Sequence, residues 1–221
     1  MPVQRAVLFV NGLITDLDAA RALLQPGDFL IAVDGGARHL AAMGLLPHLL
    51  IGDLDSLIPT EVDALEAVGV PIQRYPVEKD ETDLELAIQA ALQRGATSLL
   101  LVGALGGRID QTLANIFLLT SPLLADLDAR LDDGIEAVSI IREHAIIHGS
   151  AGDTLSLLPL GGPASGVTTA GLRYPLHAET LFPDRSRGVS NELLADRAEI
   201  RLDEGALLCV HTRNQIRKKE K

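Results

Sequence analysis

The sequence of 221 residues has little of several residue types, and each shortage narrows what the chain can be. Its one cysteine, Cys209, cannot form a disulfide within the chain, and its apolar neighbours predict a buried, unreactive thiol. Tryptophan is absent and aromatic residues make up 3% of the chain, so few side chains can stack on a ligand ring. The apolar runs are too short for a signal sequence or a membrane span, which predicts a soluble, cytoplasmic protein without a membrane partner.

Basic residues are also scarce: nineteen face thirty acidic ones, which leaves a formal net charge of −11. They cluster only in the C-terminal tail, residues 217–221. Proteins that bind nucleic acid need a basic surface against the phosphates, so we expect no nucleic-acid partner. An acidic protein that binds phosphate groups needs cations, and a divalent metal ion is therefore expected if the site handles nucleotides.

The first half of the chain alternates apolar runs with helical patterns. This alternation predicts an α/β domain with a parallel sheet, and the 47% hydrophobic content is enough for a buried core. The expected strands are residues 6–10, 29–33, 49–51, 70–75 and 99–102. The expected helices are residues 16–24, 37–43, 59–68, 83–94 and 110–119.

The second half has short strand patterns separated by Gly, Pro and Asp, which predicts a small all-β sandwich domain. Residues 198–202 and 206–211 alternate around a turn at 203–205, as the two strands of a hairpin would. We expect the boundary near residues 127–134, where four aspartates, at 126, 128, 132 and 133, crowd a polar segment. The predicted domains are therefore residues 1–130 and 131–221.

Polar, glycine-containing motifs follow two of the predicted strands. Asp34-Gly35-Gly36 precedes a helix, whose first N–H groups could bind an anion; the alternative is a purely structural turn. Asp53 and Asp55 lie two residues apart after the next strand and could converge on one hard cation. The alternative there is an Asx turn that only caps the following segment.

Two further motifs follow later strands. Lys79 precedes a helix that Asp83 enters; the lysine could bind phosphate and the aspartate a metal ion, or Asp83 could simply offset the helix dipole. A loop with three glycines, residues 103–107, leads to Arg108 and Asp110. This arginine could hold a phosphate and the aspartate could complete a metal site, or the pair could be a surface charge and a helix cap.

Ligands of open parallel sheets bind beyond the carboxyl ends of the strands, where all four motifs fall. Acidic residues gathered there, beside glycine-rich backbone, are what magnesium-dependent phosphoryl chemistry requires. The motifs thus predict a nucleotide and metal site. They do not identify the group that accepts the phosphate.

The same motifs resemble those of the thiamine pyrophosphokinase family, and the likeness runs in order through both halves. The segments that carry it are residues 34–37, 52–56, 79–85, 103–110, 171–176 and 188–192. Two of them are the most specific, Gly-Gly-Arg-Ile-Asp at 106–110 and Ser-Asn-Glu at 190–192. The chain departs from some relatives at Tyr174, where they carry Trp, and at Lys79, where they carry Gln.

The resemblance implies an α/β catalytic domain joined to a β-sandwich that helps to bind thiamine, with ATP as co-substrate and Mg²⁺ as cofactor. It also implies a homodimer whose thiamine site lies between one subunit's catalytic domain and its partner's β domain. The residues expected to be catalytic and to hold Mg²⁺ are Asp53, Asp55, Asp83 and Asp110. Those expected to face the nucleotide are Asp34, Gly35, Gly36, Lys79 and Arg108. Those expected to contact thiamine are Tyr174, Ser190 and Asn191.

The reaction expected from this likeness is attack of the thiamine hydroxyl on the β-phosphorus of ATP, with release of AMP. The protein's task would be to align the reacting groups and to neutralise charge on the phosphate oxygens. Two alternatives remain open. One is a pyrophosphokinase that acts on a pterin alcohol through the same acidic edge, and the other is a non-catalytic sensor of nucleotide or thiamine.

Overall fold

The computed structural model describes residues 3–214, and the chain divides into two compact units after Gly134. The basic tail at 217–221 lies outside the described residues. The predicted functional domains, 1–130 and 131–221, stay a prediction.

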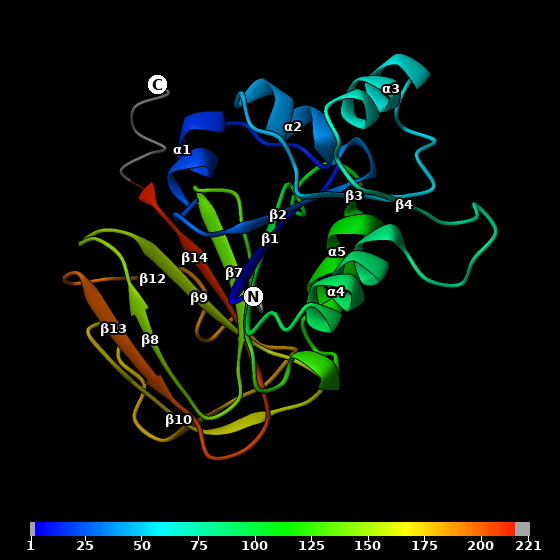
Figure 1. The fold of residues 1–221 in the computed structure, drawn as a ribbon. Helices are drawn as coiled ribbons and strands as arrows, with labels where there is room; N and C mark the ends of the chain where they lie inside the picture. The colour runs from blue at the N-terminus through cyan, green and yellow to red at the C-terminus, as the bar shows by residue number, and fades with distance from the viewer. Residues whose placement is uncertain (1–2, 215–221) are drawn as a thin grey trace. The chain divides into compact units, whose positions relative to one another are not determined.

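The first unit is a three-layer α/β structure around one parallel sheet (Figure 1). Its strand order is β6-β5-β1-β2-β3-β4, and every pair is parallel. The strands are β1 (Arg5–Phe9), β2 (Phe29–Val33), β3 (Leu49–Gly52), β4 (Ile72–Arg74), β5 (Ser98–Val102) and β6 (Asp128–Asp132). The helices are α1 (Leu17–Ala22), α2 (Ala37–Ala42), α3 (Pro59–Ala67), α4 (Asp83–Gln93) and α5 (Ile109–Leu118), with short 3₁₀ turns at η1 (Asp34–Gly36) and η2 (Pro122–Leu124).

The sheet forms because its central strands are apolar on both faces and helices cover both. Residues 6–9 of β1 and 99–102 of β5 are almost fully buried. In Figure 1 helices α1, α2 and α3 lie on one side of these strands, and α4 and α5 lie on the other. Helix α4 begins where the sequence indicates, because the Thr82 hydroxyl accepts a hydrogen bond from the Glu85 amide (3.2 Å).

Strand β6 is the element of the first unit that the sequence pattern missed. Its aspartates suggested a polar boundary segment, yet residues 128–131 pair in parallel with β5. Leu131 and Asp132 are buried. Burial of Asp132 is tolerated because its carboxylate accepts a hydrogen bond from the Gly134 amide (2.9 Å) and lies 3.5 Å from the Arg130 guanidinium.

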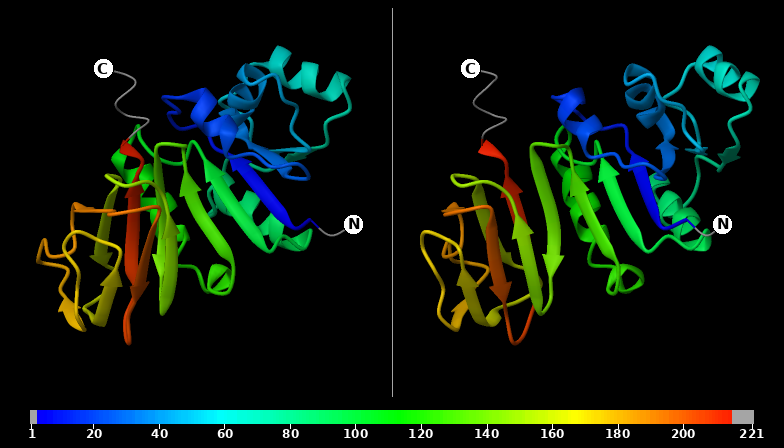
Figure 2. Two further views of the ribbon diagram at one scale, coloured as in Figure 1. Left: turned by 90° about the vertical axis from the view of Figure 1, so that its left-hand side faces the viewer. Right: turned by 60° about the vertical axis from the view of Figure 1, so that its left-hand side comes forward.

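The second unit consists of two antiparallel layers, as the sequence predicts. One layer has the order β12-β9-β14-β7 and the other β11-β10-β13-β8 (Figure 2). The strands are β7 (Glu136–Ile141), β8 (His144–His148), β9 (Thr154–Pro159), β10 (Ala164–Ala170), β11 (Glu179–Leu181), β12 (Asn191–Glu192), β13 (Arg197–Arg201) and β14 (Leu207–Thr212).

The predicted hairpin of the second unit is wrong. Strand β13 pairs with β10 and β8, whereas β14 pairs with β7 and β9. The turn at 203–205 therefore carries the chain from one layer to the other, and Ser165 holds it through hydrogen bonds with the backbone of Asp203 and Glu204. Both strands alternate because each has one buried face, and this pattern does not determine which strands pair.

A core between the two layers holds the second unit together. It includes Leu155 and Leu157 from one layer and Val167 and Ile200 from the other. Cys209 lies in this core, and burial raises the pKa of its thiol to about 12, which confirms the buried cysteine expected from the sequence. Within residues 3–214, no helix is both long enough and apolar enough to cross a membrane.

Candidate metal and nucleotide site

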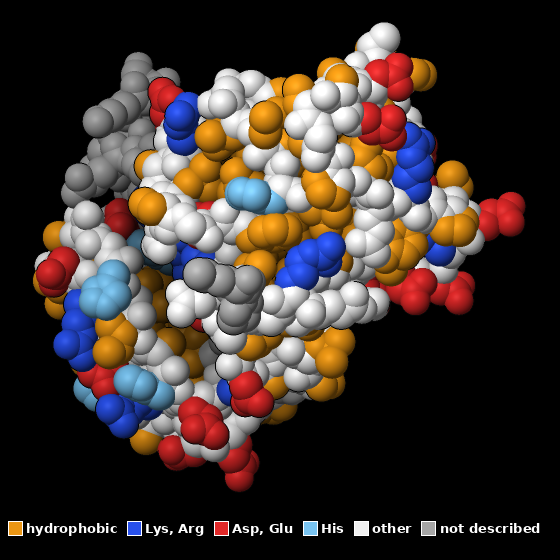
Figure 3. Space-filling model, viewed as in Figure 1, with side chains coloured by type: hydrophobic (Ala, Val, Ile, Leu, Met, Phe, Trp, Pro, Cys, Tyr) orange, Lys and Arg blue, Asp and Glu red, His pale blue; other side chains and the backbone are white. Residues whose placement is uncertain are grey.

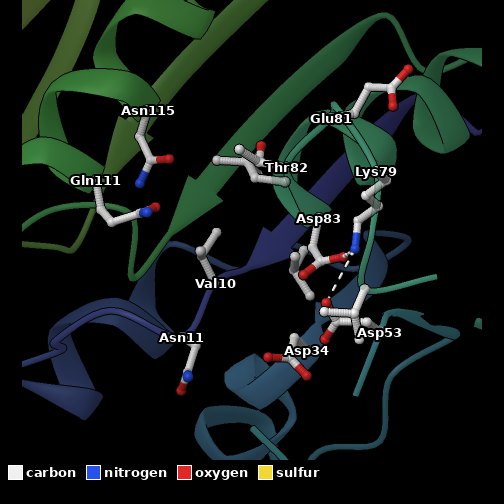
Figure 4. A pocket seen from close by; sticks show the side chains of 13 residues that line it. Val10, Asn11, Asp34, Asp53, Lys79, Glu81, Thr82, Asp83, Gln111 and Asn115 are labelled. Atoms are coloured by element: carbon white, nitrogen blue, oxygen red, sulfur yellow. Dashed lines mark hydrogen bonds and ion pairs between the residues drawn. The ribbon is translucent and has the colours of Figure 1, made fainter. Parts of the chain in front are cut away.

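Three carboxylates meet at the carboxyl edge of the parallel sheet. Asp34 follows β2, Asp53 follows β3, and Asp83 begins α4. One oxygen of each lies within 4.8 Å of the others (Figure 4). They line a cavity of about 310 Å³. Hard oxygen ligands at this spacing suit a cation such as Mg²⁺.

Asp34 is the most constrained of the three. Its backbone has φ 48°, in the left-handed region, and only 8% of the residue is exposed. Oδ2 accepts a hydrogen bond from the Ser56 hydroxyl, whereas Oδ1 is buried and has no hydrogen-bond partner among the described residues. Burial raises the pKa of Asp34, and hydrogen bonds from Ser56 and the Gly35 amide oppose this only in part. A buried carboxylate oxygen without a partner is costly, and a bound cation would satisfy it.

Asp53 and Asp83 are joined by Lys79. The ammonium nitrogen of Lys79 lies 3.2 Å from Asp53 Oδ2 and 3.0 Å from Asp83 Oδ1. Burial pushes the pKa of Asp53 up, but the Asp55 amide and Lys79 outweigh it and leave that pKa below its ordinary value. Lys79 has a raised pKa because its ion pairs with the two aspartates overcome the effect of burial. Asp53 and Lys79 are therefore both charged at neutral pH.

The backbone around the cluster is packed too tightly for most side chains. A Cβ atom at Gly36 would lie 1.8 Å from the carbonyl oxygen of Phe9 in β1. Gly52 has φ 147°, and a Cβ there would lie 3.2 Å from the Cβ of Asp34. Both glycines are thus explained by the fold, since they let the turns after β2 and β3 bring Asp34 to the cluster.

Three other predicted site residues, Asp55, Arg108 and Asp110, lie outside the group of three carboxylates. Asp55 lines a second cavity, of about 560 Å³, which also contains the glycines of the 103–107 loop and Arg108. Asp110 is exposed, and its carboxylate lies 2.5 Å from the Arg108 guanidinium. The structure therefore groups Asp34 with Asp53 and Asp83, and places Asp55, Arg108 and Asp110 at or beside the second cavity. Their roles stay predictions.

Three amide side chains that the sequence analysis missed line both cavities: Asn11, Gln111 and Asn115. Asn11 donates a hydrogen bond to the Ser56 hydroxyl (3.3 Å), which in turn contacts Asp34. Asn115 is buried and donates to the Ala104 carbonyl (2.9 Å), which fixes the glycine-rich loop against α5. Asn11 could have been found, because it lies two residues after the end of β1 and so obeys the same strand-end rule as the other motifs.

The second unit has a separate cavity of about 330 Å³, lined by Tyr174, Asn191 and residues 186–189. Tyr174 is 56% exposed. Asn191 is buried, and its side chain holds the backbone of Tyr174: Oδ1 accepts from the Tyr174 amide (3.0 Å) and Nδ2 donates to its carbonyl (2.7 Å). Ser190 is exposed, and its amide donates to the Ser156 hydroxyl (3.0 Å). Asn191 therefore positions the backbone of Tyr174 through these two hydrogen bonds.

We expect Asn191→Ala to destabilise the second unit by about 1–3 kcal/mol, because it removes the two hydrogen bonds that the buried Asn191 side chain makes with the backbone of Tyr174. The measurement is the rate at which a thiol reagent modifies Cys209, which is buried in the core of that unit. The rate should rise well above that of the wild type. Ser190→Ala is the matched control, because Ser190 is exposed and adjacent. Equal rates in the two variants would contradict the holding role of Asn191.

The fold and the carboxylate edge define a class, namely two-part proteins with a parallel α/β unit that carries an acidic edge and a β-sandwich unit. Two family models match the chain in the same order. Residues 20–131 match the thiamin pyrophosphokinase catalytic domain, and residues 143–207 match the thiamin pyrophosphokinase vitamin B1 binding domain. The chain belongs to the thiamine pyrophosphokinase family and is thus a member of an enzyme family.

Individual relatives agree with this assignment. The chain is 29% identical over 184 residues to the thiamine pyrophosphokinase of Bacillus subtilis, which covers 82% of this chain and 86% of the relative. It is similar to the crystal structure of a thiamin pyrophosphokinase family protein from Enterococcus faecalis, at 27% identity with a TM-score of 0.81, over 95% of this chain and 99% of the other. The yeast thiamin pyrophosphokinase structure shares the fold at 19% identity with a TM-score of 0.76, over 95% and 86% of the two chains.

Proposed function

We propose that this chain transfers the pyrophosphoryl group of ATP to the hydroxyl of thiamine, giving thiamine diphosphate and AMP. Membership of the family supports the reaction. The observation that carries it in this chain is the group of Asp34, Asp53 and Asp83, with one buried oxygen of Asp34 left without a partner. Such a group suits a cation that accompanies phosphate rather than an apolar ligand.

These three carboxylates fit Mg²⁺ and would hold it, and Asp55 and Asp110 remain the further ligands that the sequence predicts. The metal ion would neutralise charge on the phosphate oxygens. The nucleotide would extend into the larger cavity, whose lining includes the glycine-rich loop and Arg108. The exposed Arg108 guanidinium could then exchange Asp110 for a phosphate oxygen.

The chain's own chemistry would consist of alignment and one proton transfer. The thiamine oxygen attacks the β-phosphorus, the bond to the α-phosphate oxygen breaks, and AMP leaves with that oxygen. Asp83 and Asp110 are the candidates to accept the hydroxyl proton. The backbone turn at Gly35-Gly36, Lys79 and Arg108 would face the nucleotide.

Thiamine would bind through the second unit, where Tyr174, Ser190 and Asn191 surround or adjoin one cavity. Tyr174 is exposed enough to stack on a ring, with the Arg173 guanidinium 5.8 Å from its ring centre. The expected assembly remains a homodimer, with the thiamine site between the catalytic domain of one subunit and the β domain of its partner. The cytoplasmic location also stays a prediction.

The test is to incubate purified protein with ATP, Mg²⁺ and thiamine, and to identify the products by chromatography and phosphorus NMR. The proposal predicts AMP and thiamine diphosphate in equal amounts. ADP with thiamine monophosphate would keep the site but contradict the reaction. No turnover with thiamine, together with turnover of a pterin alcohol, would contradict the substrate. Binding of both substrates without any product would favour a sensor.

On the face drawn in Figure 3, Lys and Arg side chains stand in small groups among acidic and hydrophobic ones, which is consistent with small-molecule substrates. A cationic thiazolium substrate also suits the net charge of −11. That nucleic acid is no partner stays a prediction.

A further inference from the structure

We propose that Lys79 is an internal counter-ion of the carboxylate cluster, which competes with the divalent cation for the oxygens of Asp53 and Asp83 and leaves them when the cation binds. The inference rests on the proposed metal site and adds to it a residue that sets the metal affinity. It assigns Lys79 a positioning role toward the carboxylates in addition to the phosphate contact expected from the sequence.

The contacts of Lys79 are those of a fixed cation. Its ammonium lies 3.2 Å from Asp53 Oδ2, 3.0 Å from Asp83 Oδ1 and 3.0 Å from the carbonyl oxygen of Pro76. The Lys79 side chain is only 12% exposed. Figure 4 shows it reaching down from the loop before α4 toward both carboxylates. The ammonium donates hydrogen bonds to Asp53 and Pro76 and forms an ion pair with Asp83 Oδ1, a buried oxygen that has no hydrogen-bond partner among the described residues.

Lysine is rare in this protein, and its use at this position is therefore informative. The chain has four lysines, and the other three are among its last four residues. Every other basic residue from 1 to 217 is arginine. An ammonium is a compact charge on a flexible stem with three rotatable donors, whereas a guanidinium is a planar fork that suits bidentate pairing with a single carboxylate.

The shared oxygens make Lys79 and a divalent cation competitors. Asp53 Oδ1 accepts a hydrogen bond from the Asp55 amide (3.1 Å), and Oδ2 accepts one from Lys79. A cation bound directly to Asp53 would therefore share an oxygen that already accepts a hydrogen bond. An Mg²⁺ ion sits about 2.1 Å from its ligand oxygens, so it and an ammonium on the same oxygen would lie within roughly 5 Å of each other. Like charges at that separation repel in a partly buried site.

Asp34 gives the divalent cation an advantage over the lysine. Lys79 forms its ion pairs with Asp53 and Asp83, whereas Asp34 Oδ1 is buried without a hydrogen-bond partner among the described residues. A cation bound to all three carboxylates would satisfy this oxygen, which the ammonium leaves unsatisfied. The lysine would therefore hold Asp53 and Asp83 in place until a divalent cation that also binds Asp34 displaces its ammonium.

The first experiment measures binding of Mg²⁺ and of Mn²⁺ alone, by calorimetry, to the full-length wild type, to Lys79→Met and to Arg74→Met. Coupling between two binding events is typically 5- to 150-fold, so we expect Lys79→Met to lower the dissociation constant by at least about fivefold. Arg74→Met is the matched control, because it removes one positive charge at the end of the neighbouring strand β4 and Arg74 pairs with Glu66 instead. It should change the constant less than twofold, on the order expected of an exposed charge.

The second experiment uses the wild type and so does not depend on a variant that folds. Acetylation of Lys79 by an amine reagent is followed on the tryptic peptide that begins after Arg74 and ends at Arg94. The rate is normalised to an added reference peptide. Lys79 should react slowly in chelator and several-fold faster at saturating Mg²⁺, because its ammonium has left the carboxylates.

These results separate the inference from the reaction. Tighter metal binding by Lys79→Met together with faster acetylation at saturating Mg²⁺ supports the inference even if thiamine is not turned over. Unchanged metal affinity, or acetylation that is as slow with Mg²⁺ as without, overturns it even if the enzyme is active. Failure of both metal ions to bind the wild type and Lys79→Met overturns the inference and the metal site together.

Discussion

Asp53→Asn should abolish Mg²⁺ binding and lower the rate of pyrophosphoryl transfer by at least about 100-fold. Changes to residues that merely support metal ligands already cost roughly 10- to 100-fold, and Asp53 is proposed to touch the metal ion itself. The variant removes a carboxylate that the Asp55 amide and Lys79 hold in its charged form. The measurements are calorimetric Mg²⁺ binding and initial rates of AMP release.

The matched control for this variant is Asp63→Asn. It makes the same chemical change at an exposed position of helix α3. Its metal affinity and rate should equal those of the wild type within about twofold, since surface charges far from a site have small effects. If Asp53→Asn bound Mg²⁺ as tightly as Asp63→Asn does, Asp53 would not be a ligand.

The second large effect concerns stability. Gly36→Ala should lower the free energy of unfolding by about 3 kcal/mol or more, because the new Cβ would lie 1.8 Å from the Phe9 carbonyl oxygen and 2.5 Å from its carbon. Both are backbone atoms of a buried central strand, and they cannot yield as a flexible side chain would. Unfolding in urea, followed by circular dichroism, measures the loss.

Backbone conformation does not explain the need for glycine at this position, since Gly36 has φ −57°, which any residue adopts. The effect is therefore a test of close packing alone. Gly162→Ala is the control, because no atom lies within 4 Å of the added Cβ and the position has no strained φ. We expect it to change stability by no more than about 0.5 kcal/mol. A Gly36→Ala protein as stable as this control would show that the turn after β2 can move away from β1.

Much of the fold could be predicted because the signals are local. Five of the six parallel strands were expected from the sequence, and four of them are apolar runs long enough to recognise. They alternate with helices whose starts are marked by Thr82 and Pro59. Strand β6 was missed because its hydrophobic residues are few and its buried Asp132 is compensated by Arg130 and the Gly134 amide, contacts that no local pattern shows. The hairpin at 203–205 failed for a related reason, since alternation reveals a buried face but not the neighbouring strand.

The candidate site, like the fold, was predictable from the sequence only in part. The sequence alone determined that acidic and glycine-rich motifs follow successive strands, because the order of strands and helices makes those ends meet at one edge of the sheet. Only the tertiary structure decided which carboxylates converge. Leu54, with φ 67°, turns the chain between Asp53 and Asp55, and their side chains line different cavities.

Asp34 reaches the cluster through its own left-handed backbone at φ 48°, although the motif suggested only a nucleotide contact for it. Asp110 pairs with Arg108 on the exposed start of α5 instead. The position of a residue relative to the end of a strand determines that its Cα atom lies at the edge of the sheet. The direction of its side chain depends on a few backbone torsions and on the packing around them, and these are settled only when the chain has folded.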